Sequence, residues 1–119
     1  MIPRSELKRI HMLSDMPEAM LDRIASIARL YIYSANMPLF ESGENLKNFY
    51  MILTGQVSLS IDLVTDVSIT LGTVGPGHAC GVSAFIPDSR SSSKAVCDEP
   101  SELIVLSADD VFEMFEQDW

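Results

Sequence analysis

The feature that most constrains the fold of this chain is a change in the spacing of its apolar residues near residue 30. Before this point apolar side chains recur every three or four residues, as on one face of a helix, and after it they alternate with polar ones, as in a strand. The alternating segments are short and separated by turn residues, at 30–33, 37–40, 49–53, 57–61 and 67–71. Short strands of this kind are typical of an antiparallel sandwich or barrel, whereas a Rossmann-type domain would alternate strands with helices.

Helical patterns flank the strand region on both sides. Two apolar stripes at helical spacing precede it, a short one over residues 7–13 and a longer one over residues 17–29 that begins at Pro17. After the apolar strand 103–106, the hydroxyl of Ser107 can cap a last helix. We therefore predict a single domain of 119 residues, with N-terminal helices over 1–29, a β-roll over 30–106 and the start of a C-terminal helix over 107–119.

The acidic charge of the chain lies entirely in its second half. Residues 1–60 carry six basic and six acidic side chains, whereas residues 61–119 carry two basic and eleven acidic ones, so the formal charge of −9 belongs to the second half. An acidic chain is repelled by nucleic acid and anionic lipid, so we expect neither as a direct partner. No apolar stretch approaches the roughly 20 residues of a membrane span. Two cysteines are too few for a disulfide framework and fit a reducing cytoplasm.

The two basic residues of the second half, Arg90 and Lys94, lie in one serine-rich segment that starts at Gly81. Glycine allows backbone N–H groups to approach an anion closely, and a short helical turn beginning there would direct its positive end outward. Four serines surround the arginine: Ser89, Ser91, Ser92 and Ser93. This combination predicts a site for a small phosphate. The alternative is a solvated loop in which Arg90 pairs with a nearby carboxylate such as Asp88, and the local sequence favours neither.

The residue types on which most enzymes depend do not form a recognisable constellation. The only histidines, His11 and His78, do not form the His-x-His pair from which jelly-roll cupins build a metal site, so we expect no metal, and we expect His78 in an exposed turn. Cys80 and Cys97 lie 17 residues apart without a Cys-x-x-Cys pair, which favours buried thiols over zinc or redox chemistry. No serine stands in a Gly-x-Ser-x-Gly motif. We therefore predict a protein that is not an enzyme and uses no cofactor.

Four spaced motifs make the chain similar to the cyclic nucleotide-binding domain family. Residues 39–44, Leu-Phe-Glu-Ser-Gly-Glu, and 49–57, Phe-Tyr-Met-Ile-Leu-Thr-Gly-Gln-Val, resemble the family's apolar pair, Gly-acidic turn and Phe-Tyr-Ile-Ile/Leu-x-x-Gly-x-Val signature. Residues 71–82 are similar to Leu-Gly-x-x-Gly-x-x-x-Gly-Glu, with glycines in place at Gly75, Gly77 and Gly81. The segments 102–106 and 109–112 also resemble the family, so the resemblance extends over about residues 10–116.

The resemblance implies an eight-stranded antiparallel β-jelly-roll flanked by helices, with a phosphate-binding cassette inside the roll that holds cAMP or cGMP. In such a cassette a Gly-Glu pair opens a short helix, the glutamate accepts a hydrogen bond from the ribose 2′-hydroxyl, and an arginine binds the cyclic phosphate. Carried onto this sequence, the expected ligand-binding residues are Gly81, Val82, Ser83, Ala84, Arg90, Ser91 and Ser92.

The cassette departs from the family pattern at two places. Val82 stands where the family has the glutamate, and its side chain cannot accept a hydrogen bond; Ser83 is the one nearby hydroxyl that could substitute. Counted forward from Gly81, the phosphate-binding position falls on Arg90, but counted back from the strand 103–106 it falls on Ser91. A one-residue bulge would reconcile the two counts. A missing acceptor costs about 1–3 kcal/mol, so we expect weak binding of a cyclic nucleotide or binding of another phosphate ligand.

Two functions follow, and the sequence leaves both open. In the first, the domain is a ligand sensor in which a cyclic nucleotide or related phosphate orders the cassette and shifts the helix after Ser107. In the second, a roll without ligand is a protein–protein interaction or dimerisation module. Val82 and the one-residue displacement of the arginine favour the second hypothesis, whereas the isolated cations Arg90 and Lys94 in an acidic half favour the first. A homodimer, or a separate effector protein docking on the C-terminal helix, would carry the output. Trp119 indicates either an aromatic side chain docked on the roll or a chain cut short.

Overall fold

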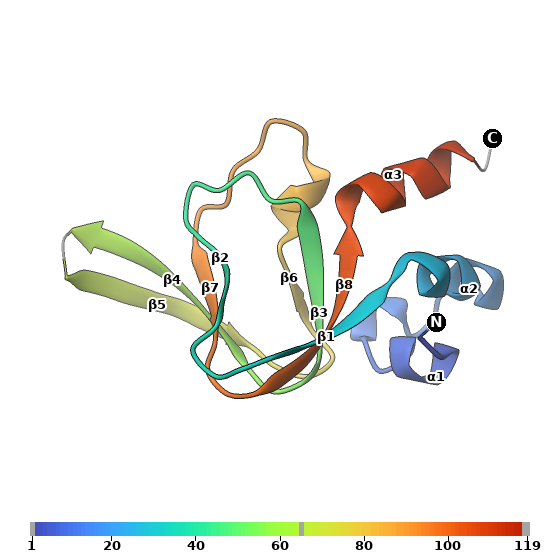
Figure 1. Ribbon diagram of the computed structural model, residues 1–119, viewed down its shortest axis with the longest axis horizontal. Helices are drawn as coiled ribbons and strands as arrows, with labels where there is room; N and C mark the ends of the chain where they lie inside the picture. Colours follow the sequence, from blue (N-terminus) through green and yellow to red (C-terminus); the bar gives the residue numbers. More distant parts are fainter. Residues whose placement is uncertain (1, 65, 118–119) are drawn as a thin grey trace.

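The computed structural model describes residues 2–64 and 66–117, and these residues form two four-stranded antiparallel sheets that face one another (Figure 1). In the first sheet the strand order is β1-β8-β3-β6, with the bounds Arg29–Tyr33, Ser101–Ser107, Asn48–Thr54 and Ala79–Cys80. In the second sheet the order is β2-β7-β4-β5, with the bounds Pro38–Phe40, Lys94–Cys97, Val57–Val64 and Val67–Val74. This arrangement is the antiparallel jelly roll that the sequence predicts.

The N-terminal region forms three short helical segments on one side of the roll (Figure 1): α1 (Arg4–Leu7), the 3-10 helix η1 (His11–Leu13) and α2 (Glu18–Ile27). The stripe over residues 7–13 is not one helix, because Ile10 has extended backbone angles. The backbone N–H of His11 donates to the carbonyl of Gly77 at 2.8 Å, so the roll takes a hydrogen bond that a continuous helix would use itself. The apolar residues of the stripe are nevertheless all buried: Leu7, Ile10 and Leu13.

The C-terminal helix α3 (Ala108–Glu116) begins where the sequence predicts. The hydroxyl of Ser107 accepts a hydrogen bond from the backbone N–H of Asp110 at 3.4 Å, and Asp109 and Asp110 lie in the first turn, where the helix dipole favours negative charge. Trp119 lies outside the described residues. No helix in the described part of the chain is long and apolar enough to cross a membrane.

The central strands β3 and β8 are buried on both faces, which explains why their sequences are continuously apolar rather than alternating. One face of each strand packs inside the roll, in a cluster with Phe40, Val57, Ala95 and Cys97 from the opposite sheet. The other face packs against the helices, in a cluster with Leu7, Leu21, Ile24 and Met114. Residues of the two strands divide between the clusters by alternation, Ile52 and Leu103 into the first and Met51 and Ile104 into the second.

Candidate ligand-binding site

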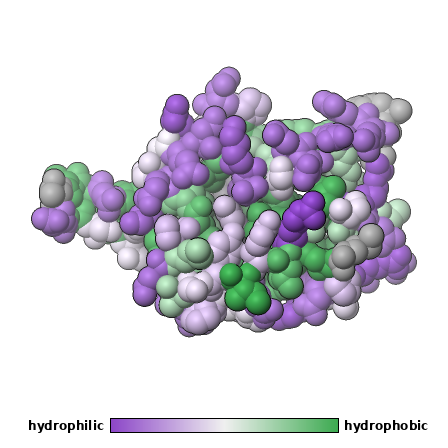
Figure 2. Space-filling view, viewed as in Figure 1, coloured by the Kyte–Doolittle hydropathy of each residue, from purple (hydrophilic) through white to green (hydrophobic). Residues whose placement is uncertain are grey.

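A cavity of about 450 Å³ lies between the serine-rich segment and the interior of the roll. Six of the seven sequence-predicted site residues line it: Gly81, Val82, Ser83, Arg90, Ser91 and Ser92. Ala84 does not line the cavity but is buried in the cluster inside the roll. The remaining walls are mostly apolar and come from four strands and a loop, through Phe40, Leu46, Phe49, Leu59, Ala79 and Cys80. Figure 2 shows hydrophilic surface over the loops at the top of the molecule, which close this end of the roll.

The backbone conformation of Gly81 determines the shape of one wall. Gly81 has φ 90° and ψ 26°, in the left-handed region, and the 3-10 helix η2 (Val82–Phe85) starts directly after it. A Cβ atom at this position would lie 3.1 Å from the carbonyl oxygen of Asn48 and 3.3 Å from Cδ2 of Tyr50. Both the φ angle and the contact with β3 therefore require glycine. The short helical turn that the sequence predicts at Gly81 is confirmed.

Arg90 lies at the cavity with most of its hydrogen-bonding capacity unused. Its Nη1 donates to the carbonyl of Gly43 at 3.0 Å, and within residues 2–64 and 66–117 it forms no ion pair. The alternative in which Arg90 pairs with Asp88 is therefore wrong. A guanidinium has five N–H donors, so the other donors of Arg90 face solvent and the cavity mouth. The contact with Gly43 was not predicted, although the Gly-acidic turn at 43–44 was part of the family resemblance.

Ser91 is buried and its polar groups are occupied by the loops themselves. Its hydroxyl donates to the carbonyl of Ser93 at 2.6 Å and accepts from the N–H of Ser93 at 3.2 Å. Its N–H donates to the carbonyl of Glu44 at 2.9 Å, and its carbonyl accepts from the N–H of Gly43 at 2.7 Å. Ser91 thus joins two loops and has little capacity left for a ligand, whereas its neighbour Arg90 keeps several free donors.

The position after Gly81 offers no acceptor to a ligand. Val82 is 63% exposed and lines the cavity, and no carboxylate is found among the lining residues that the structure describes. Ser83 also lines the cavity, and its hydroxyl has no hydrogen-bond partner in the described part of the chain. Ser83, which follows Val82 in the sequence, can therefore accept a hydrogen bond from a ligand.

The two cysteines are buried, unpaired thiols, as the sequence predicts. Cys80 lines the cavity, and burial raises the pKa of its thiol to about 12, so the thiol stays protonated at neutral pH. Burial also raises the pKa of Cys97. Because the thiolate is the reactive form, neither cysteine is suited to nucleophilic or redox chemistry. His78 is exposed, as predicted, but its ring also contacts that of His11, with centroids 4.6 Å apart.

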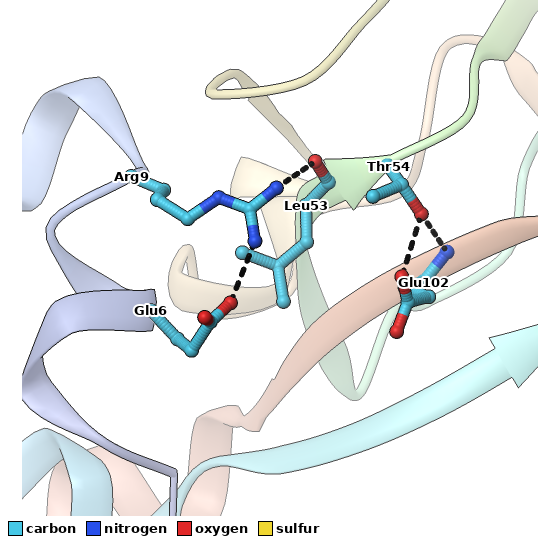
Figure 3. Close-up of polar contacts among 5 residues, drawn as sticks. All are labelled: Glu6, Arg9, Leu53, Thr54 and Glu102. Atoms are coloured by element: carbon cyan, nitrogen blue, oxygen red, sulfur yellow. Dashed lines mark hydrogen bonds and ion pairs between the residues drawn. The ribbon is translucent and has the colours of Figure 1, made fainter.

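A second and larger groove, of about 660 Å³, lies between the N-terminal helices and the first sheet. Two of its charged side chains, Glu6 and Arg9, pair with each other (Figure 3). Arg9 donates to a carboxylate oxygen of Glu6 at 2.7 Å and to the carbonyl of Leu53 at 3.2 Å, which ties the N-terminal segment to the end of β3. On the neighbouring strand, Glu102 accepts from the hydroxyl of Thr54 at 3.1 Å. Of the two cations that line this groove, Arg9 is already paired, and Glu6 and Glu102 add negative charge, so the groove suits an anionic ligand less well than the smaller cavity.

Comparisons with known proteins agree with the geometry. A family model described as cyclic nucleotide-binding domain matches residues 32–118. The cyclic AMP receptor protein of Thermus thermophilus is 27% identical over 90 residues, which are 76% of this chain and 42% of that protein, so the chain spans about two fifths of this relative's length.

Two solved structures share the fold. The structure of a cyclic nucleotide-binding-like protein from Brucella abortus has a TM-score of 0.80 at 25% identity, covering 95% of this chain and 97% of that one. The regulatory domain of PKA from Toxoplasma gondii, co-crystallised with cAMP, has a TM-score of 0.83 at 17% identity, covering 94% of this chain and 43% of that one. Because the family model matches most of the chain, the chain belongs to the cyclic nucleotide-binding domain family.

Proposed function

We propose that this domain is a regulatory, non-enzymatic sensor that binds cAMP, cGMP or a related small phosphate in the 450 Å³ cavity. The observation that carries the proposal is Arg90, a cavity-lining guanidinium with one hydrogen bond to Gly43 and no counter-ion in the described part of the chain. The half of the chain around it holds the entire formal charge of −9. A planar, permanently charged donor with free N–H groups suits phosphate oxygens, and a bound phosphate would supply the missing counter-ion.

The remaining cavity residues support the same class of ligand. A volume of about 450 Å³ is within the usual range for small-molecule sites, which is about 300–1,000 Å³. The apolar wall formed by Phe40, Leu46 and Leu59 suits the flat face of a purine base. Ser83 and Ser92 provide hydroxyl groups near the arginine. In this proposal Arg90 holds the phosphate, the apolar wall holds the base, and Ser83 takes over part of the role of the family's glutamate.

The proposed affinity is low because Val82 cannot accept a hydrogen bond from a ribose hydroxyl. A buried polar group left without its partner costs about 1–3 kcal/mol, which corresponds to a roughly 5- to 150-fold loss of affinity. Val82 is 63% exposed, so water can reach the unpaired hydroxyl and the loss falls toward the lower end of this range. We propose a dissociation constant in the micromolar range rather than the nanomolar range.

The proposed signal passes from the cassette to α3 through three aromatic rings. Phe85 belongs to η2, and its ring centroid lies 5.1 Å from that of Phe49 and 6.4 Å from that of Phe112, which it meets edge to face. Phe112 is on α3. A ligand that moves η2 would therefore change the packing of α3, and a preference of the ligand for one of the two arrangements would shift their populations. We propose that α3 is the element that a partner protein reads, in the cytoplasm.

A second candidate function is an interaction module that binds no nucleotide. It is favoured by exposed apolar side chains on the cassette, where Val82 and Ile86 are 63% and 53% exposed, and on α3, where Phe112 and Phe115 are 43% and 47% exposed. Exposed apolar groups next to one another mark a surface that another protein can cover. This candidate requires no ligand in the cavity, so a binding measurement separates it from the sensor.

Isothermal titration of the purified domain with cAMP and with cGMP tests the proposal. We expect micromolar binding of at least one nucleotide and its loss in Arg90→Ala. The matched control is Arg29→Ala, because Arg29 is also exposed but lies on β1, outside the cavity. Equal binding by both variants would contradict the role of Arg90. No heat from either nucleotide at millimolar concentration would leave the interaction module as the better function.

A further inference from the structure

The strand β1 has one backbone edge that no described strand covers. It stands first in the order of its sheet and pairs only with β8, in an unbroken register from Arg29 opposite Val105 to Tyr33 opposite Ser101. About half of the N–H and C=O groups of an edge strand point away from its sheet. Proteins usually protect such edges with charged residues, prolines or bulges, and β1 has only Arg29, at its first position. The edge of β1 is therefore available to a further strand.

The side chains of β1 are apolar and exposed on both faces of the sheet. Leu30 is 48% exposed, Tyr31 is 47% exposed and Ile32 is 77% exposed. Figure 2 shows strongly hydrophobic surface on the near face of the molecule, where β1 crosses the front of the roll in Figure 1. The uncovered backbone edge and the exposed apolar side chains of β1 each indicate an interaction site rather than a solvated surface.

We propose that β1 pairs antiparallel with β1 of a second copy of this chain, about a two-fold axis that passes through Tyr31. The strand is self-complementary in this register. Leu30 lies opposite the partner's Ile32, and Tyr31 lies opposite the partner's Tyr31. Arg29 lies opposite the partner's Tyr33, where its guanidinium can stack on the aromatic ring. All five residues of β1 find a partner, and the symmetry closes the assembly at two copies.

A groove beside β1 provides apolar surface for the most exposed side chain of the strand. The groove of about 660 Å³ has an apolar lining of Ile2, Pro3, Ala28, Leu30 and Leu53. Leu30, at its edge, is the residue that lies opposite the partner's Ile32 in the proposed register. Ile32 of each copy therefore leaves water and packs beside the groove of the other copy.

The self-complementary register and the charge of β1 favour a second copy as the occupant. The strands that pair lie within residues 1–60, which carry six basic and six acidic side chains, and β1 itself has no acidic residue. Arg29 forms no ion pair within the described residues, so pairing does not break an existing one. Five paired residues on each side bury much less than the roughly 1,200 Å² at which specific interfaces begin, so the dimer is weak and depends on concentration.

Sedimentation equilibrium over about 10–500 µM protein, where a weak dimer dissociates, tests the proposal. We expect wild-type protein to dimerise, and Leu30→Glu and Ile32→Lys each to raise the dissociation constant at least about tenfold. The double variant L30E/I32K should dimerise again, because each new carboxylate lies opposite the partner's new ammonium group. The matched control is Leu71→Lys on β5, because Leu71 is 57% exposed and lies on the other sheet. This control should dimerise like the wild type.

A cross-linking experiment tests the position of the axis independently. Tyr31→Cys places a thiol opposite the same thiol of the second copy, so the variant should form an intermolecular disulfide on mild oxidation. Tyr33→Cys lies opposite Arg29 of the second copy and should not form one. The native cysteines are both buried. Monomers at every concentration, a double variant as monomeric as the single ones, or dissociation by Leu71→Lys but not by Ile32→Lys would each overturn the proposal. Circular dichroism of each variant confirms that it is folded.

Discussion

The substitution Gly81→Ala tests whether the cassette is held in shape by the close contact between Gly81 and β3. An alanine at this position must adopt φ 90°, and its Cβ must lie 3.1 Å from the carbonyl oxygen of Asn48. Neither neighbour can move freely. Asn48 pairs with Ser107 in the sheet, and the ring of Tyr50 is buried, with its hydroxyl donating to the carbonyl of Leu39 at 3.4 Å.

The control Gly43→Ala separates the cost of the backbone angle from the cost of the contact. Gly43 has a similar φ of 82°, but a Cβ there would have no atom within 4 Å. An alanine in the left-handed region costs about 1–2 kcal/mol, and this term is common to both variants. Overpacking against a rigid neighbour adds about 1–3 kcal/mol, and this term applies only to Gly81→Ala. We therefore expect losses of about 1–2 kcal/mol for Gly43→Ala and about 2–5 kcal/mol for Gly81→Ala.

Urea denaturation at 25 °C, followed by circular dichroism, measures both losses on the same scale. A domain of this size loses about 3–6 °C of melting temperature per kcal/mol, so a thermal scan should rank the variants in the same order. Equal destabilisation of the two variants would refute the argument, because the contact with β3 would then contribute nothing. A smaller loss in Gly81→Ala than in Gly43→Ala would show that the cassette relaxes away from the sheet.

Three further predictions concern the cavity and its connection to α3. Burial raises the pKa of Cys80 to about 12, whereas an unfolded thiol loses its proton near pH 9, so the free energy of unfolding should fall by about 1.4 kcal/mol per pH unit above pH 9. Denaturation at pH 8, 9 and 10 measures this slope, and Cys80→Ala should reduce it; an unchanged slope would contradict the burial of the thiol. Val82→Glu should raise the affinity for cAMP about 5- to 50-fold, because it restores at an exposed position a carboxylate that accepts a hydrogen bond from the ribose hydroxyl. An unchanged affinity in isothermal titration would show that Val82 is not the cause of weak binding. Phe112→Ala should leave the affinity for cAMP within about threefold but abolish the effect of cAMP on amide hydrogen exchange in α3, and a persisting effect would exclude the ring contact with Phe85 as the route.

Much of the fold was predictable from the sequence because the turn residues and the capping serine act locally. The helix after Ser107 begins where its cap predicts, and the short turn after Gly81 is present. The break in the first helical stripe was not predictable, because it depends on a hydrogen bond from His11 to Gly77, which is distant in the sequence. Periodicity reports which residues are buried, but it does not report where a backbone N–H finds its acceptor.

The candidate site was predictable in its residues but not in its connections. The segment from Gly81 to Ser92 carries the glycine, the serines and the cation together, so residue chemistry and the family resemblance both pointed to it as a candidate. The sequence could not decide whether Arg90 or Ser91 occupies the phosphate-binding position. Counting forward from Gly81 gives Arg90, whereas counting back from the strand 103–106 gives Ser91. In the structure the two residues contact the loop around Gly43 in different ways. Ser91 bonds to this loop through its own backbone, whereas Arg90 donates to the carbonyl of Gly43 through its side chain. Such a contact between two loops has no periodic signal in either one.

The central claim is that a cyclic nucleotide binds in the cavity beside Arg90, and a ¹H–¹⁵N correlation spectrum recorded during titration with cAMP tests it most directly. The account predicts chemical-shift changes that saturate with ligand and are largest for the backbone amides of Gly43, Gly81 to Ala84 and Arg90 to Ser92. Smaller changes should follow in α3. No change up to about 5 mM cAMP, or changes centred on the groove beside Arg9 and Leu53, would contradict the account.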